Sequence, residues 1–155
     1  MSQHFSAPWS SKLKLLTGAF VAICVAVGVL TEGWLSLIPY GIIVLTAAFA
    51  VRGYSVTDGH LLIHRLGWAN RVDLAEIEHA NHAPGVTVGS VRTFGIGGAF
   101  GFIGYFRNAV LGAYQAYVTD TANAVVLQLP EKTIVVTPER PAEFVAAIEA
   151  GQGQP

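Results

Sequence analysis

Two long apolar runs open the chain, and strand-like alternation follows them. The runs are Leu15–Leu30 and Trp34–Val51, and neither contains a charged residue. A helix rises about 1.5 Å per residue, so the runs would extend roughly 24 Å and 27 Å, slightly less than a bilayer core of about 30 Å. Both are rich in Leu, Ile, Val and Phe, which favour insertion. We therefore expect two membrane-spanning helices.

A very short link joins the two runs and forces an antiparallel helical hairpin. The link is Thr31–Gly33, and its only charge is Glu32. Lys12 and Lys14 precede the hairpin, and Arg52 follows it. Because positive residues favour the cytoplasmic side, both ends of the hairpin are expected to face the cytoplasm and the link to face the outside. Two rival interpretations are buried core helices and, for the first run, a cleavable signal peptide.

A stripe of small residues lies along the first predicted helix. Gly18, Ala22 and Ala26 recur every four residues and therefore share one face. Small residues let a neighbouring helix approach closely. The neighbour is either the second helix of the same hairpin or a helix of another chain.

After the second run the pattern changes to short strands. Tyr54–Thr57 and His60–His64 alternate apolar and polar residues, with Asp58-Gly59, a strong hairpin-turn signal, between them. Further strand-like segments are Trp68–Asp73, Glu78–Ala83, Ala113–Val118, Ala124–Leu129 and Thr133–Thr137. About seven short strands in roughly 100 residues predict a small antiparallel barrel or sandwich.

An amphipathic helix is predicted to cap this β-structure at the C-terminus. Ala142–Ala150 has apolar residues at helical spacing, Pro141 suits a first helical position, and Gly151 suits a helix end. The predicted organisation is a cytoplasmic tail (1–12), a two-helix transmembrane hairpin (13–52), an α+β, mainly-β domain (53–150) and a tail (151–155).

Composition narrows the functional class. Charged residues make up 12% of the 155 residues, against about 25% in an ordinary soluble domain. The 9 Lys and Arg are balanced by 10 Asp and Glu, so a concentrated basic face for nucleic acid is not expected. The single cysteine, Cys24, excludes a disulfide framework within the chain and a Cys-based zinc site.

Four blocks in a fixed order resemble a known family. They are Tyr54–Ile63, Arg71–Ile77, Phe94–Asp120 with its Gly- and Phe-rich start, and Ile134–Pro138 before a helix containing Glu143 and Phe144. The order resembles the bacterial pleckstrin-homology-like (PH-like) domains, particularly membrane-anchored members with a Gly/Phe-rich insert, over about 53–150. The resemblance implies two nearly orthogonal antiparallel sheets capped by a C-terminal helix. It carries over no catalytic residue.

The Gly/Phe-rich block is the most unusual stretch after the hairpin. Phe94–Phe106 holds five glycines, five aromatic residues and no charge, and its spacing fits neither a dinucleotide fingerprint nor a phosphate loop. Three interpretations stay open: a long twisted hairpin packed on the sheet, a loop that dips into the lipid head groups, and a site for a protein partner. The candidate partner or lipid contacts are Arg92, Phe94, Phe100, Phe102, Tyr105, Phe106 and Arg107.

Titratable residues indicate little chemistry. Four histidines, His60, His64, His79 and His82, follow no metal-site spacing, and no serine stands in a recognisable nucleophile motif. We therefore expect no catalytic residue, no cofactor and no metal, and hence no enzyme. The basic residues after position 53 are scattered, so a cluster for phosphoinositide head groups is not expected either.

The expected function is a non-enzymatic scaffold at the inner membrane. The contact surfaces would be the Gly/Phe-rich block and any exposed sheet edge, to which a partner adds a strand. The partner is another protein or a second copy of the chain. One alternative is a lipid-surface sensor that uses Arg92, Phe100, Phe102 and Arg107. Another is an accessory subunit of a larger membrane complex.

Overall fold

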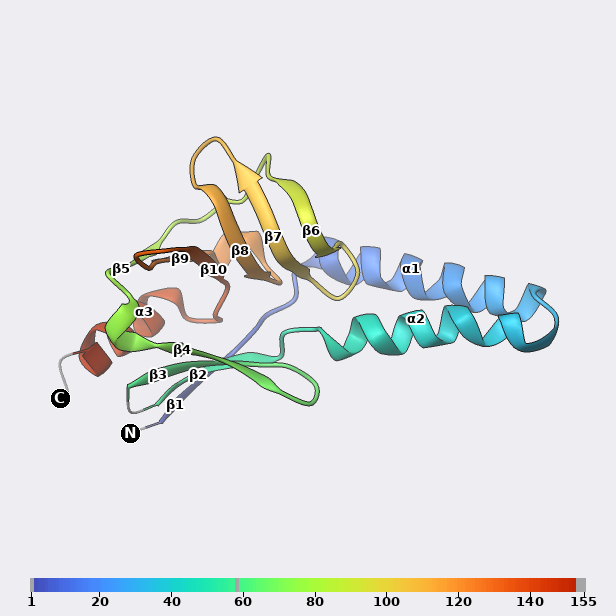
Figure 1. Cartoon of the computed structure of the whole chain (residues 1–155), viewed down its shortest axis with the longest axis horizontal. Coiled ribbons are helices and arrows are strands. Elements are labelled where there is room, and N and C mark those ends of the chain that lie inside the picture. Colours follow the sequence, from blue (N-terminus) through green and yellow to red (C-terminus); the bar gives the residue numbers. More distant parts are fainter. Residues whose placement is uncertain (1, 58, 153–155) are drawn as a thin grey trace.

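Two β-sheets pack on each other, and a helical hairpin projects from them (Figure 1). The structure is a computed structural model that describes residues 2–57 and 59–152. The strands are β1 (Gln3–Ser6), β2 (Gly53–Thr57), β3 (His60–His64), β4 (Ala69–Asp73), β5 (His79–His82), β6 (Val91–Gly97), β7 (Phe102–Asn108), β8 (Gly112–Val118), β9 (Val125–Gln128) and β10 (Thr133–Val136). The helices are α1 (Ser11–Leu30), α2 (Leu37–Ala48) and α3 (Pro141–Gln152), with short 3-10 helices η1 (Gly33–Ser36), η2 (Leu74–Glu76) and η3 (Thr121–Asn123).

The first sheet contains a strand that the sequence analysis missed. Residues 1–12, expected to form a tail, contain β1, which pairs antiparallel with β2 and places Phe5 opposite Tyr54. The sheet order is β1-β2-β3-β4. The helical hairpin is therefore an insertion between two neighbouring strands of one sheet. Asp58, part of the predicted β2–β3 turn, lies outside the described residues.

The hairpin itself has one long helix and one short one. Ser10 caps α1, because its side-chain oxygen accepts a hydrogen bond from the Leu13 N–H at 3.2 Å. Among the described residues, α1 is the one helix long and apolar enough to cross a membrane, whereas the η1–α2 segment is shorter. The two helices contact each other closely where Gly28 faces Tyr40, because a Cβ on Gly28 would lie 2.7 Å from the Tyr40 ring. The structure thus has the hairpin, while two crossings remain a proposal.

The small-residue stripe does not face α2. Gly18, Ala22 and Ala26 are all exposed, and a Cβ on Gly18 would meet no atom within 4 Å. The face of α1 that is less exposed runs instead through Thr17, Cys24 and Gly28. Of the two neighbours considered for the stripe, the chain's own second helix is therefore excluded.

The second sheet is mixed instead of wholly antiparallel. Its order is β5-β9-β10-β8-β7-β6, and β10 runs parallel to β8. The reason is the path of the chain. After β8, the chain passes through η3 and forms β9 two places away from β8 in the sheet. The β9–β10 hairpin then places β10 between β9 and β8, antiparallel to β9 and parallel to β8. Ten strands form in the described residues, more than the seven or so predicted, partly because the Gly/Phe-rich block adds two.

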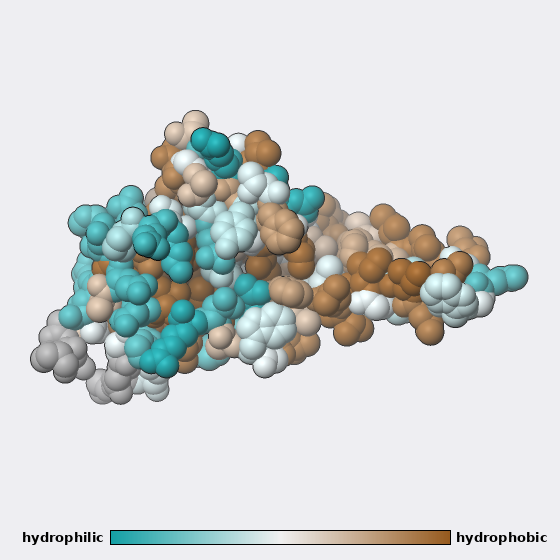
Figure 2. All heavy atoms as spheres, viewed as in Figure 1, coloured by the Kyte–Doolittle hydropathy of each residue, from teal (hydrophilic) through white to brown (hydrophobic). Residues whose placement is uncertain are grey.

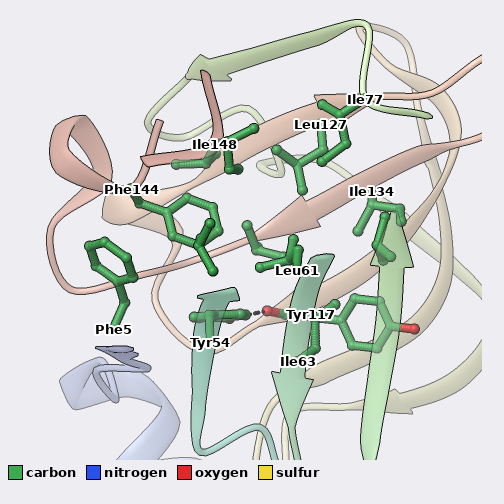
Figure 3. Packing of buried hydrophobic residues seen from close by; sticks show 14 of the residues in the cluster. Phe5, Tyr54, Leu61, Ile63, Ile77, Tyr117, Leu127, Ile134, Phe144 and Ile148 are labelled. Carbon is green, nitrogen blue, oxygen red and sulfur yellow. Dashed lines mark hydrogen bonds between the residues drawn. The ribbon is translucent and has the colours of Figure 1, made fainter. Parts of the chain in front are cut away.

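The main core lies between the sheets and under α3 (Figure 3). Phe5 from β1, Tyr54 from β2 and Phe144 from α3 meet there, with Phe5 and Phe144 edge to face at 5.2 Å. The Tyr54 hydroxyl is fully buried, donates to the Tyr117 carbonyl at 2.7 Å and accepts from the Thr137 N–H at 3.1 Å. This single hydroxyl therefore ties the first sheet to β8 and to the residue that follows β10 in the second sheet.

The C-terminal helix continues past its predicted end. Gly151 lies inside α3, and the Gln152 amide donates to the carbonyls of Leu74, at 3.1 Å, and Ile77. A Cβ on Gly151 would lie 2.5 Å from the Leu74 side chain. Gly151 is therefore a packing position against η2 and not a helix stop. Residues 153–155 of the predicted tail lie outside the described residues.

We predict an alkaline loss of stability that depends on Tyr54. Burial raises the pKa of Tyr54 from 10.0 to about 12. Because the folded state keeps Tyr54 protonated to a higher pH than the unfolded state does, the contribution of this hydroxyl to the free energy of unfolding is complete below pH 10. That contribution is lost as the pH rises through about 12. The loss should be about 2–3 kcal/mol. Denaturant unfolding of the full chain in mild detergent, at about pH 9 and pH 11.5, measures it.

The Tyr54→Phe variant is the control, because it lacks the titrating hydroxyl but keeps the ring. Its free energy of unfolding should fall less than that of the wild type over this pH interval. At pH 9 it should already be less stable by about 1–3 kcal/mol, since the Thr137 N–H loses its buried acceptor. Equal alkaline losses for the two chains would contradict the prediction.

Candidate functional site

The Gly/Phe-rich block forms a β-hairpin at the edge of the second sheet. Strands β6 and β7 pair antiparallel, with Gly95 opposite Gly104 and a register shift between Arg92 and Phe94. A Cβ on either glycine would lie 2.3 Å from a carbonyl oxygen of the opposite strand, and their φ angles are 118° and 133°. These glycines therefore permit a backbone approach that no other residue allows.

The aromatic side chains of this hairpin lie in three different environments: a second core cluster, the solvent-exposed surface, and a contact with α1. Phe102 and Phe106 pack, together with Tyr114, in a second cluster on the other face of the sheet from the main core. Phe94 and Tyr105 are paired across the strands and are 76% and 54% exposed. Of the predicted contact residues, Phe106 is only 6% exposed and packs as a core residue of this cluster, at the wall of a pocket.

Phe100 docks the turn of this hairpin onto α1. Its ring lies edge to face with Trp9 at 6.0 Å and with Phe20 at 6.5 Å. Its backbone N–H donates to the Thr17 hydroxyl at 2.9 Å. The turn between β6 and β7 thus lies beside the second turn of α1, close to where the helical hairpin leaves the sheets (Figure 1).

The two arginines that bracket the block in sequence do not form a pair in space. Arg107 is exposed opposite Val91. The curved β6 brings the Arg92 side chain back over Gly97, where a Cβ would lie 3.4 Å from it. The backbones of Arg92 and Arg107 therefore lie at the same end of the strand pair, whereas the Arg92 side chain reaches along β6 toward the docked turn.

A groove that sequence analysis missed lies between the end of α2 and the β6–β7 hairpin. Its volume is about 370 Å³. Its lining includes Leu45, Phe49, Arg65, Phe94, Tyr105 and Gln115. Arg65 is the one charged residue of this lining. No sequence signal marked it, because its neighbours come from segments far apart in the chain.

Three of the described histidines, His4, His60 and His64, have side-chain hydrogen-bond partners. The His64 ring bonds to the Ser55 hydroxyl at 2.7 Å, and His4 bonds to the same hydroxyl at 3.0 Å. Partial burial, and then the nearby His4, lower the pKa of His64. Within residues 2–57 and 59–152, no three His, Cys, Asp or Glu side chains come together in a way that could hold a metal ion.

Two packed sheets closed by a C-terminal helix define the architecture of the domain. A family profile described as a bacterial PH domain matches residues 52–151, and the chain belongs to this family. The resemblance seen in the sequence is thereby confirmed. Searches of curated proteins and of solved structures returned no match. Membership indicates a non-enzymatic interaction module.

Proposed function

We propose that this chain is a membrane-anchored, non-enzymatic PH-like module that holds a protein partner at the cytoplasmic face of a bacterial inner membrane. The observation that carries the anchoring is the apolar surface of the helical hairpin (Figure 2). Its large exposed side chains include Leu15, Ile23, Val29, Leu30, Leu37, Val44 and Leu45. Exposure of so large an apolar surface to water is unfavourable, whereas lipid tails would cover it.

The pairing of β1 with β2 supports two crossings. Because β1 precedes the hairpin and β2 follows it, pairing requires both strands on the same side of the membrane. An even number of crossings meets this requirement, and a single crossing by α1 does not. The shorter η1–α2 segment can cross with local bilayer thinning and with Trp34 at the far interface. Lys12, Lys14 and Arg52 at the base favour a cytoplasmic domain.

Strand β6 is the surface we assign to the protein partner. It is a seven-residue strand at the edge of the second sheet, and nearly all of it is exposed. Val91 and Phe94 are 69% and 76% exposed along it. An edge strand presents unpaired backbone N–H and carbonyl groups, to which an extended segment of another protein can add.

We predict that a photo-crosslinking amino acid at Phe94 captures one stoichiometric partner in intact cells. The same amino acid at Val110, equally exposed in the β7–β8 turn, is the control and should not capture that protein. Purification in mild detergent and mass spectrometry identify the product. Recovery of the chain without a partner would contradict the assignment of β6. Recovery from the soluble fraction would contradict the anchoring.

The docking of Phe100 on α1 favours lipid-surface binding as a second candidate function. If α1 begins at the interface, its second turn and the docked turn of β6–β7 lie at the depth of the lipid head groups. Replacement of Ala99, in this turn, by Asp should then weaken membrane association of the full chain without loss of fold. An unchanged resistance to alkaline extraction would remove this candidate.

A further inference from the structure

We propose that the groove between α2 and the β6–β7 hairpin binds an anionic phospholipid of the cytoplasmic leaflet, with Arg65 as the residue that holds its phosphate. This rests on the proposed function in one respect, namely that the helical hairpin lies in the membrane. It adds a ligand, a site and a residue that the anchoring alone does not require.

The position of Arg65 is the first argument. Arg65 directly follows β3, and its backbone N–H donates to the Trp68 carbonyl at 2.9 Å. The end of β3 adjoins the end of the hairpin, because the Arg52 N–H donates to the His64 carbonyl at 2.9 Å. Arg65 therefore lies where the chain leaves the proposed membrane, which is the level of the lipid phosphates.

The surroundings of the guanidinium group are the second argument. Its central carbon lies 5.6 Å from the Phe49 ring, 5.6 Å from the Trp68 ring and 5.1 Å from the Tyr117 ring. Aromatic rings attract a guanidinium group through their faces. Burial raises the pKa of Tyr117, and the positive charge of Arg65 acts against this larger effect to lower it. We call these three side chains and Arg65 the arginine cage.

The third argument is an unpartnered donor. The Nε atom of Arg65 is buried and has no hydrogen-bond partner among the described residues. No carboxylate in residues 2–57 and 59–152 forms an ion pair with Arg65. Arg65 as a whole is half-buried, and a donor atom that is buried without a partner is costly, so a native structure needs a reason to keep one. Phosphate is one of the two anions, with carboxylate, whose geometry the planar fork of arginine matches.

The remaining walls of the groove match the apolar part of the same ligand. Leu45, Phe94, Ile96 and Ile103 line it, and polar atoms contribute little of its surface. Leu45 lies on the exposed apolar surface of α2, so the groove continues directly into the surface that lipid tails would cover. One charged donor at the head and apolar walls leading into the membrane fit a phospholipid. They do not fit free phosphate, which has no apolar part.

Native mass spectrometry of the full chain in mild non-ionic detergent tests the proposal. The probes are phosphatidylglycerol, phosphatidylcholine with the same acyl chains, and inorganic phosphate. We expect one phosphatidylglycerol to bind more tightly than phosphatidylcholine, and excess phosphate not to displace it. Equal binding of the two lipids, or displacement by phosphate, would overturn the proposal.

Three variants make the test specific. Arg65→Gln should weaken phosphatidylglycerol binding about tenfold, the loss of one charge-assisted hydrogen bond. Lys132→Gln removes the same charge at the exposed β9–β10 turn and should leave binding unchanged. Phe94→Ala shortens an exposed wall of the groove and should weaken binding severalfold, whatever Arg65→Gln does to folding. Wild-type affinity in both Arg65→Gln and Phe94→Ala would refute the site.

The outcome also separates this proposal from the proposed function. If the chain fractionates with membranes and the Arg65→Gln variant binds phosphatidylglycerol as well as the wild type does, the lipid site is refuted and the membrane anchor stands. If the chain fractionates as a soluble protein, both proposals are refuted.

Discussion

Replacing Phe5 by alanine will lower the free energy of unfolding by about 3–5 kcal/mol, a large part of the stability of a small domain. Phe5 is 2% exposed, packs edge to face on Phe144, and lies under the Arg140 guanidinium group at 5.4 Å. Its strand β1 has only four residues, so no other β1 side chain can replace this contact. Denaturant unfolding of the full chain in mild detergent measures the loss.

Gln3→Ala on the same strand is the matched control and should change stability by less than about 0.5 kcal/mol, because Gln3 is exposed. A loss below about 1 kcal/mol for Phe5→Ala would show that β1 is not part of the folded core. The prediction also bears on domain truncation. A fragment that starts at Gly53 lacks β1, leaves the β2 edge unpaired and should be poorly folded.

Replacing Gly104 by alanine will disrupt the β6–β7 hairpin and cost at least about 3 kcal/mol. The new Cβ would lie 2.3 Å from the Phe94 carbonyl oxygen, a backbone atom that cannot move aside without breaking the strand pair. The φ angle of 133° adds strain for any residue with a Cβ. Stability and the retention of the protein partner should fall together, since β6 is held through β7.

Gly112→Ala is the control that separates the steric clash of a new Cβ from the backbone strain of a positive φ. Gly112 has a positive φ of 67°, but a Cβ there would meet nothing within 4 Å. Its replacement should therefore cost only about 1 kcal/mol. Thermal unfolding of both variants in detergent decides the matter. Similar costs for Gly104→Ala and Gly112→Ala would mean that the close approach of β6 and β7 does not exist.

Local patterns predicted the elements whose residues alternate clearly. His60–His64 coincides with β3, which buries one face, and Thr133–Thr137 nearly coincides with β10, whose β-branched apolar run is buried on both faces. The segment Gln3–Ser6 has a single apolar residue, Phe5, and so no period to recognise. The parallel pairing of β8 with β10 depends on where a later hairpin returns, which no local pattern records.

The candidate site was predictable only in part. The Gly/Phe-rich block was correctly marked as unusual, but its aromatic side chains serve three separate purposes, and alternation alone does not tell exposed Phe94 from docked Phe100. The arginine cage joins Phe49, Arg65, Trp68 and Tyr117, which come from three distant parts of the chain. In sequence, Arg65 is one basic residue among several scattered ones.

The insertion of the helical hairpin between β1 and β2 has a consequence for biogenesis. The strand that completes the core is synthesised before the helical hairpin, and its partner is synthesised after it. If the hairpin is the membrane anchor proposed above, a molecule in which only one of its two helices crosses the bilayer leaves Phe5 and Tyr54 on opposite sides of the membrane. That molecule cannot bury its core, exposes the edge of β2 and becomes a substrate for proteolysis. Under the proposed anchoring, the domain would therefore fold only in molecules whose hairpin has inserted with both of its ends on the same side of the membrane.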